Sequence, residues 1–339
     1  KDGYVTENVV VEAIADNGNA TGISLNNSAL VTDPALKNLT ISSISKNADN
    51  KTATGVNLEN NSNFNAQADD ISILAGKDSS IYGSGKAISA LGDSTVTLNA
   101  NNITLGGAVY AEGSKTSVEL SGLNNGNAVN DVYSAAVIDK AGDLNGKDQG
   151  GMDVVSALYA EEGAEINLSG VNNIRTYYTD PSDEHTSERA VWAYKGADIT
   201  IDGVTNISTS KYEISPENRD IAIAAGTATE LKEADFTEAA LGKVEVANVN
   251  LNYKAGSAIN GDILAAYGGV VNITDANAAS RDVNGGAGTG IAITGDLLAG
   301  NKGKLTVDLG NNGVLIGRAD DYGDAELNNG HGSGDEDGF

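Results

Sequence analysis

The sequence predicts an all-β protein, a right-handed parallel β-helix (β-solenoid) of about a dozen coils with loop insertions. Three observations predict it: a short motif repeats along most of the chain, the apolar residues are mainly aliphatic, and proline is scarce. The 339 residues include 42 glycines and 3 prolines, and aromatic residues make up 5%. Aliphatic side chains suit a narrow core of many thin layers, and proline would interrupt the hydrogen bonds between coils.

Each copy of the repeat has a short apolar strand, a turn that contains glycine, and a second strand in which apolar and polar residues alternate. Clear copies occupy residues 87–98, 108–120, 157–168, 190–201, 262–273 and 296–307, and looser copies begin near residues 21 and 54. Alternation such as Val96 and Leu98 turns one face of the strand inward. One coil cannot bury its apolar side alone, so successive coils are expected to stack at about 4.8 Å.

Asparagine and glycine are frequent where one strand of the repeat gives way to the next. Asparagine tolerates the left-handed backbone conformation of a sharp turn, and its side chains can hydrogen-bond in ladders between coils. The alternative architecture, an array of β-sandwiches, would show hairpin turns and more aromatic residues. The composition therefore favours the solenoid.

Four segments interrupt the repeat and are expected to be insertions, at 126–153, 175–189, 209–220 and 227–241. Insertions on a solenoid often gather on one binding face, and the middle two, which leave from similar points of consecutive copies, are expected to lie close together. Tyrosine and arginine in such loops suit contact with a glycan or a protein, although loops that pack down as flaps remain an alternative. The candidate binding residues are Arg175, Tyr177, Tyr178, His185, Arg189, Tyr212 and Arg219.

The charge balance excludes several classes of partner. A formal net charge of −26, from 47 acidic and 21 basic residues, disfavours nucleic acids and anionic membranes, which bind clustered Lys and Arg. There is no cysteine, hence no disulfide, and no 18-residue apolar run that would form a membrane-spanning helix. The polar start at Lys1 has no signal-peptide pattern, so we expect a mature or trimmed part of a larger protein.

Catalytic and metal-binding motifs are weak. The order of Ser94, His185 and His331 does not fit a chymotrypsin-like triad, and two histidines without cysteine cannot form a zinc cluster. Asp320-Asp321 and Gly330-His331-Gly332 resemble part of the polygalacturonase pattern, but its other signatures are missing. Residues 318–339 form an acidic, glycine-rich tail whose carboxylates would suit Ca²⁺, yet it has neither EF-hand spacing nor a nonapeptide array. We expect no enzyme activity and no cofactor, with calcium left open.

The C-terminal runs at 257–273 and 291–322 resemble the passenger domains of autotransporters, specifically the AIDA-type, self-associating adhesins. The likeness extends over most of the chain as a pattern but is specific only in those runs. It implies residues 1–317 as a passenger β-helix, followed by a tail that leads to a C-terminal module and an outer-membrane β-barrel, both missing here. Nothing in the family pattern marks an adhesive residue, so no site is transferred.

The resemblance implies an adhesin at the bacterial cell surface, secreted across the outer membrane. It would mediate cell–cell aggregation, biofilm formation or host attachment and so contribute to virulence. Its partner would be its own copies on neighbouring cells, or a host glycan or protein, met through the side of the β-helix. The alternatives are a β-helical polysaccharide hydrolase or lyase and a passive stalk that carries a distal functional domain.

Overall fold

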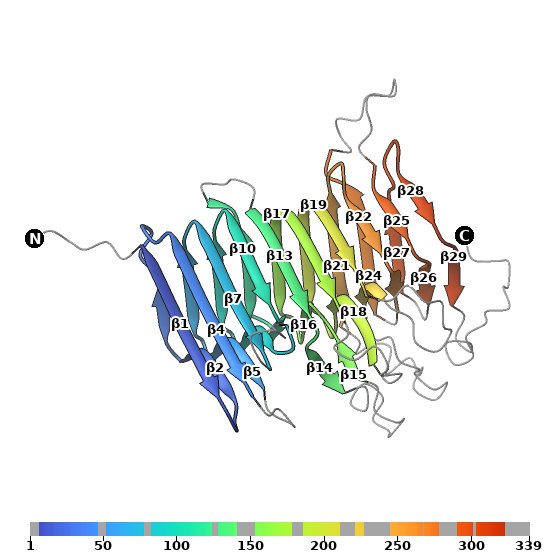
Figure 1. The fold of residues 1–339 in the computed structure, drawn as a ribbon. Helices are drawn as coiled ribbons and strands as arrows, with labels where there is room; N and C mark the ends of the chain where they lie inside the picture. The colour runs from blue at the N-terminus through green and yellow to red at the C-terminus, as the bar shows by residue number, and fades with distance from the viewer. Residues whose placement is uncertain are drawn as a thin grey trace, which may run out of the picture.

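The computed structural model confirms an all-β fold of stacked parallel strands, a parallel β-helix (Figure 1). The structure describes residues 7–46, 52–77, 83–123, 128–140, 153–177, 186–210, 221–226, 245–266, 268–277, 290–300 and 303–322. Each turn of the helix contributes one strand to each of three rows, which we call the first, second and third rows. Strands within a row are hydrogen-bonded in parallel to their neighbours in the adjacent turns.

The first row is one sheet, and the other two rows join at a bend to form a second, larger sheet. The first row comprises β2 (Ala20–Asn26), β5 (Ala53–Glu59), β8 (Lys86–Leu91), β11 (Ala108–Glu112), β16 (Leu158–Glu161), β18 (Thr186–Ala193), β20 (Ile221–Ala225), β23 (Asp262–Ala265), β26 (Leu297–Gly300) and β29 (Ala319–Tyr322). The second row comprises β3 (Ala29–Val31), β6 (Asn63–Gln67), β9 (Thr95–Asn99), β12 (Ser117–Ser121), the first halves of β17 (Glu165–Thr176) and β19 (Asp198–Ser208), β21 (Ala247–Tyr253), β24 (Gly269–Asp275) and β27 (Lys304–Val307).

The third row completes each turn, and in β17 and β19 one long strand passes through the bend from the second row to the third. It comprises β1 (Asn8–Ala15), β4 (Asn38–Ser45), β7 (Asp70–Gly76), β10 (Asn102–Gly106), β13 (Ala128–Ser134), the second halves of β17 and β19, β22 (Ala258–Asn260), β25 (Ala292–Thr294) and β28 (Val314–Ile316). Within the described residues these strands make nine complete turns, from β2–β3–β4 to β26–β27–β28. The sequence indicated about a dozen coils, and β1 and β29 add partial turns at the two ends.

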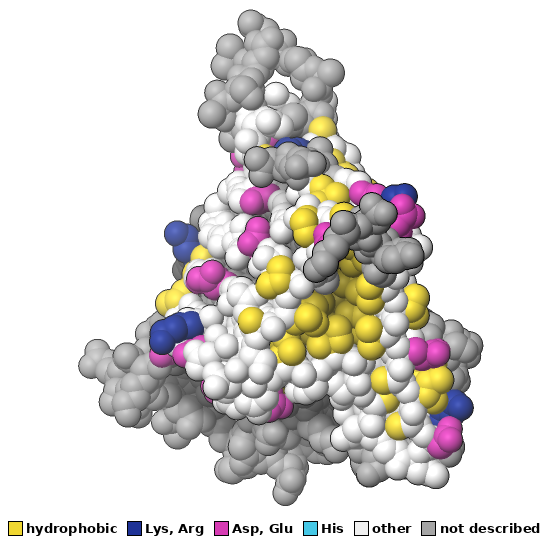
Figure 2. All heavy atoms as spheres, turned by 90° about the vertical axis from the view of Figure 1, so that its left-hand side faces the viewer, with side chains coloured by type: hydrophobic (Ala, Val, Ile, Leu, Met, Phe, Trp, Pro, Cys, Tyr) yellow, Lys and Arg dark blue, Asp and Glu magenta, His cyan; other side chains and the backbone are white. Residues whose placement is uncertain are grey.

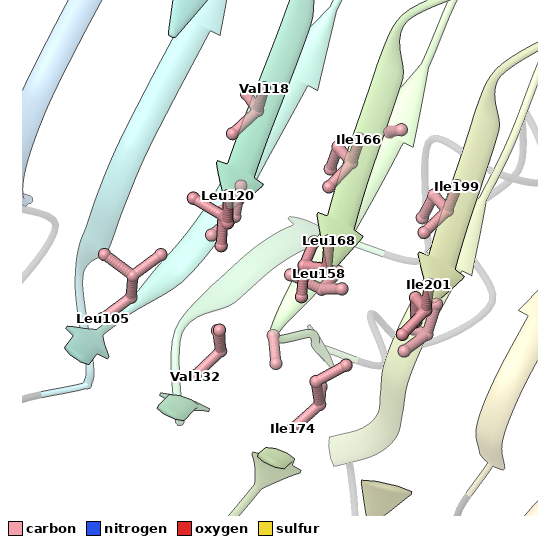
Figure 3. Packing of buried hydrophobic residues seen from close by; sticks show 14 of the residues in the cluster. Leu105, Val118, Leu120, Val132, Leu158, Ile166, Leu168, Ile174, Ile199 and Ile201 are labelled. Carbon is pink, nitrogen blue, oxygen red and sulfur yellow. The ribbon is translucent and has the colours of Figure 1, made fainter. Parts of the chain in front are cut away.

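The core is a single aliphatic column in which equivalent residues of successive turns lie on top of one another. Val118 pairs in register with Ile166, and Ile166 with Ile199, and all three side chains are buried (Figure 3). Fully burying each such side chain stabilises the fold by about 1.5–3 kcal/mol. The alternation read from the sequence therefore does place these residues inside.

The turns between the first and second rows use left-handed backbone. Asn27 has φ 48° and Asn60 has φ 53°, and the equivalent turns of later coils place Asp93, Glu162 and Lys195 in the same region. Asparagine and aspartate tolerate this conformation better than most residues. Side-chain hydrogen bonds between turns, such as Asn206 Nδ2 to Asn173 Oδ1 at 3.1 Å, confirm the predicted asparagine ladders.

One ladder of polar side chains lies inside the core. Asn130 of β13 donates to Asn172 Oδ1 of β17 at 2.7 Å, and Asn172 donates to Thr205 Oγ1 of β19 at 3.3 Å. Backbone carbonyls accept the remaining protons, from Asn130 to Ser169 O and from Asn172 to Asp202 O. The ladder ends below Asn130, whose in-register neighbour is Ile103, and there the buried Asn130 Oδ1 has no partner.

This ladder changes the bounds of the first expected insertion. Residues 128–134 were expected to lie outside the repeat, but they form β13, a regular third-row strand. The inward positions of β13 include Asn130 and Ser134, both fully buried, so the strand lacks the apolar alternation that reveals the others. Beyond it, β14 (Val137–Lys140) and β15 (Asp153–Val155) form an antiparallel pair, and β15 also pairs with the start of β18.

At the C-terminal end the repeat also continues further than expected. Residues 319–322 form β29, which pairs in parallel with β26, although the acidic tail was expected from residue 318. Figure 2 looks onto the N-terminal end of the helix and shows a group of apolar side chains there. In the first described strands, Val9, Val11, Ile23 and Leu25 pack against the core but are only partly buried.

Replacement of Asn172 by alanine is expected to reduce the free energy of unfolding by about 2–3 kcal/mol. The change removes the acceptor for Asn130 and the donor to Thr205 in a dry environment, where unsatisfied polar groups are costly. Urea denaturation followed by circular dichroism measures the change. Asn167→Ala, at a half-exposed outward position of the same strand, is the control and should change stability by less than about 0.5 kcal/mol. Equal effects of the two variants would contradict the buried ladder.

Candidate functional surface

Two of the predicted binding residues, Arg175 and Tyr177, lie together where the third-row strands β13 and β17 end. The Arg175 guanidinium binds Asp131 through Nη1–Oδ1 at 2.7 Å and Nη2–Oδ2 at 3.3 Å, and it lies 5.1 Å from the centre of the Tyr133 ring. The Tyr133 and Tyr177 rings are 6.4 Å apart. Burial is the main cause that raises the pKa of Tyr177 above its ordinary value. The charge of Arg175 is thus already paired, which reduces its attraction for an acidic partner.

Arg189 lies in a different environment from the exposed loop position that we expected. It is buried, with its guanidinium 4.2 Å from the centre of the Trp192 ring. Its neighbour Glu188 is also buried and accepts hydrogen bonds from the Ser210 backbone and hydroxyl, each at 2.6 Å. Burial removes Arg189 from the accessible surface, so it acts within the fold and we drop it from the candidate binding residues.

The other predicted residues, Tyr178, His185, Tyr212 and Arg219, lie outside the described residues, so their roles stay predictions. The strands that flank the two middle insertions are described. Arg175 of β17, the first residue of the segment 175–189, pairs in register with Ser208 of β19, which directly precedes the segment 209–220. The chain therefore enters both insertions from adjacent turns at the same edge of the helix. Proximity of the two segments themselves stays a prediction, because most of their residues lie outside the described ranges.

The outward side of the second row is a flat array of hydrogen-bonding side chains that the sequence reasoning did not single out. Successive strands place Thr, Asn, Ser, Asp and Glu at every outward position from β9 to β21. In-register pairing stacks these residues in three columns along the helix. The columns are Thr95–Ser117–Glu165–Asp198–Asn248, Thr97–Glu119–Asn167–Thr200–Asn250 and Asn99–Ser121–Ser169–Asp202–Asn252.

Hydrogen bonds along the columns hold several of these side chains in place. Asn248 donates to Asp198 Oδ1 at 2.6 Å, and Asn252 donates to Asp202 Oδ1 at 2.6 Å. Ser121 donates to Asn99 Oδ1 at 2.6 Å. One bond does not saturate an amide or a carboxylate, so these side chains keep further donor or acceptor capacity. The array is therefore ordered yet able to bind a further surface. In the sequence, this array corresponds to the polar residues that alternate with the buried apolar ones. From the sequence, we used that alternation only to identify the core.

A groove of about 480 Å³ follows the third column, next to the bend between the second and third rows. Its walls carry Asn99, Glu119, Ser121, Ser169, Asp202, Asn252 and Lys254, and backbone at Gly122, Gly170 and Gly203 lines it between them, with Ala276 at one end. Its volume lies within the range of ordinary ligand sites, although its walls are polar.

A second apolar cluster lies on the outward side of the first row. Tyr110, Tyr159 and Trp192 occupy equivalent outward positions of β11, β16 and β18. The Tyr110 and Tyr159 ring centres are 5.3 Å apart, and those of Tyr159 and Trp192 are 4.8 Å apart. All three side chains are buried. The repeats AVYAE, ALYAE and AVWAY each carry an aromatic residue at their third position, and these three residues form the stack.

The Tyr110 hydroxyl joins two adjacent turns. It lies 2.7 Å from Glu112 Oε2 and 2.7 Å from Glu161 Oε1, and Lys195 Nζ is 3.4 Å from the other oxygen of Glu161. Glu112 and Glu161 pair in register, so without these contacts two like charges would face each other. Burial, followed by the position of the hydroxyl within hydrogen-bonding distance of the two carboxylates, raises the pKa of Tyr110 well above its ordinary value.

Comparison with protein-family models, curated proteins and solved structures gives no match. Within the described ranges, acidic and histidine side chains form no group of three that could hold a metal ion. The part of the chain that the structure describes contains no helix long and apolar enough to cross a membrane. The functional argument therefore depends on the surfaces themselves.

The fold is expected to lose stability as the pH rises above 10, and Tyr110→Phe should make this loss shallower. Because the folded-state pKa of Tyr110 is raised, its contribution is fully present below the pKa of an unfolded tyrosine, about 10, and decreases at higher pH. Thermal unfolding of both proteins between pH 7 and 11.5 measures the effect. A parallel loss in the two proteins would show that Tyr110 does not carry this dependence.

Proposed function

We propose that this chain is a surface-displayed bacterial adhesin, the passenger part of an autotransporter, which contacts other surfaces through the side of its β-helix. Aggregation of neighbouring cells, biofilm formation and host attachment are the processes that such contact would serve. The observation that carries the proposal is the outward side of the second row, with its ordered columns of Asn, Thr, Ser, Asp and Glu. A flat array of this kind can form many weak hydrogen bonds at once with a facing surface.

Many weak contacts suit adhesion because avidity multiplies them. A single net hydrogen bond contributes only about 0.5–1.5 kcal/mol. Many displayed copies on one cell raise the effective concentration of each further contact. The rigid stack of turns keeps the donors and acceptors in fixed positions, so little conformational entropy is lost when two surfaces meet.

The net charge of −26 opposes contact between two copies. Salt screens exposed charges beyond about 8 Å at physiological ionic strength, so the repulsion acts mainly where carboxylates meet directly. The column Thr95–Ser117 begins with two uncharged residues on adjacent turns. Neutral positions of this kind are where a facing copy can approach, and they are the positions to test.

The alternative function, a polysaccharide hydrolase or lyase, depended on Asp320-Asp321 and on Gly330-His331-Gly332. Asp320 and Asp321 belong to β29, the last described strand, and residues 330–332 lie outside the described residues. No specific observation in the described part favours this alternative over the adhesin.

Cells that display the chain are expected to clump less when Thr95 and Ser117 are both replaced by glutamate. Two added carboxylates would have to be desolvated in the contact, at a cost of several kcal/mol. The measurement is the settling rate of displaying cells, normalised to the amount of chain on their surface. Thr40→Glu with Ser72→Glu is a matched control, because these residues are the same Thr–Ser pair on adjacent turns of the third row.

The control pair should clump like the unmodified chain. If the Thr95/Ser117 variant clumps at the unmodified rate, or only the control pair loses clumping, the assignment of contact to the second row is wrong.

A further inference from the structure

The groove beside the second row has a structural origin that sets it apart from the flat array. The long strands β17 and β19 bend at Gly170 and Gly203, which have φ of 122° and 116°. A Cβ at Gly203 would lie 2.0 Å from Gly170 O, and one at Gly170 would lie 2.2 Å from Ala128 O. The tight stack therefore requires glycine there, and the missing side chains leave exposed backbone along the bend between polar walls.

The walls of the groove have hydrogen-bonding capacity that the fold does not use. The hydroxyl of Ser169 and the ammonium of Lys254 make no side-chain hydrogen bond with any described residue. Asp202 uses Oδ1 to accept from Asn252 and keeps Oδ2 available, and Asn99 accepts from Ser121 and keeps its amide protons. The groove therefore offers both acceptors and donors, as a ligand with many hydroxyl groups requires.

The length of the groove favours a polymer. Its lining residues come from β9, β12, β17, β19 and β21 and from Ala276 just beyond β24. These strands occupy six consecutive turns, and five steps of about 4.8 Å give a length of about 24 Å. The same classes of side chain recur on turn after turn, so a chain of repeating units would meet similar contacts along the groove.

Charge decides which polymer fits. The lining holds two carboxylates, Glu119 and Asp202, and one ammonium, Lys254, within a chain whose net charge is −26. A negative field lowers the local concentration of anionic polymers such as uronates, sulfated glycans and nucleic acids. A neutral chain with many hydroxyl groups avoids this repulsion and can donate to both carboxylates.

We propose that this groove is a binding site for a linear, uncharged polysaccharide, with Ser169, Asp202 and Asn99 as its central contacts. The inference rests on the proposed adhesin function and names a ligand class for one edge of its contact surface. Affinity for one short oligosaccharide is low, since the contacts are individually weak, and display of many copies raises the affinity for a long chain.

The test is titration of the purified chain with cellohexaose and chitohexaose, and with hexagalacturonate as the anionic probe, followed by amide chemical shifts in NMR spectra. We expect at least one neutral hexamer to bind, and hexagalacturonate to bind at least tenfold more weakly. Ser169→Trp fills the groove and should weaken neutral binding at least tenfold. Ser72→Trp, a half-exposed serine on the third row, is the matched control and should bind as the unmodified chain does.

Asp202→Asn keeps the oxygen that accepts from Asn252 and removes one charge, so it should reduce the discrimination against hexagalacturonate. Thermal unfolding of each variant confirms that it is folded. The proposal is overturned if neither neutral hexamer binds at up to 10 mM. It is also overturned if Ser169→Trp binds like Ser72→Trp, or if hexagalacturonate binds as tightly as the neutral hexamers.

Failure of this inference is distinguishable from failure of the proposed function. If the hexamers do not bind but the Thr95/Ser117 glutamate variant still loses clumping, only the groove is misassigned. If the hexamers bind through Ser169 while that variant clumps normally, the groove stands and contact through the flat array is wrong.

Discussion

The in-register stacking of successive turns is the constraint on which every other feature depends. A residue at one position of a turn must pack against the residues at the same position in the turns above and below it, about 4.8 Å away. Inside, this produces the aliphatic column of Val118, Ile166 and Ile199. At the bend it requires glycine at positions 170 and 203, where a side chain would collide with the preceding turn. The same rule that builds the core therefore shapes the groove.

Stacking also turns individual polar residues into extended surfaces. An asparagine or threonine that faces outward acquires similar neighbours along the rod, and the hydrogen bonds from Asn248 to Asp198 and from Asn252 to Asp202 fix their directions. Inside the core the same geometry lets Asn130 donate to Asn172, and Asn172 donate to Thr205. A surface made in this way is rigid, repetitive and long, which are the properties that multivalent adhesion or the binding of a polymer would use.

The sequence was sufficient for the fold because its alternation has a simple physical cause, one buried face per strand. It was insufficient where polar residues are buried. Asn130 and Ser134 occupy inward positions of β13, so that strand lacks the apolar alternation. Arg189 is buried against Trp192, although its charge suggested an exposed position. The pairing of Arg175 with Asp131 joins residues 44 positions apart, and no local pattern reveals it. The groove was equally hidden, because it depends on how two rows meet at Gly170 and Gly203. The stacked aromatic residues, by contrast, were visible in the aligned repeats.

The central claim is that the second row forms one rigid, regular face, and distances between spin labels on that face test it most directly. Thr97 and Asn272 lie in the same column, five in-register steps apart through Glu119, Asn167, Thr200 and Asn250. Labels on cysteines introduced at these two positions, measured by double electron–electron resonance, should give one narrow distribution near 24 Å, five steps of about 4.8 Å. A broad distribution, or a mean beyond about 40 Å, would contradict the stacked face.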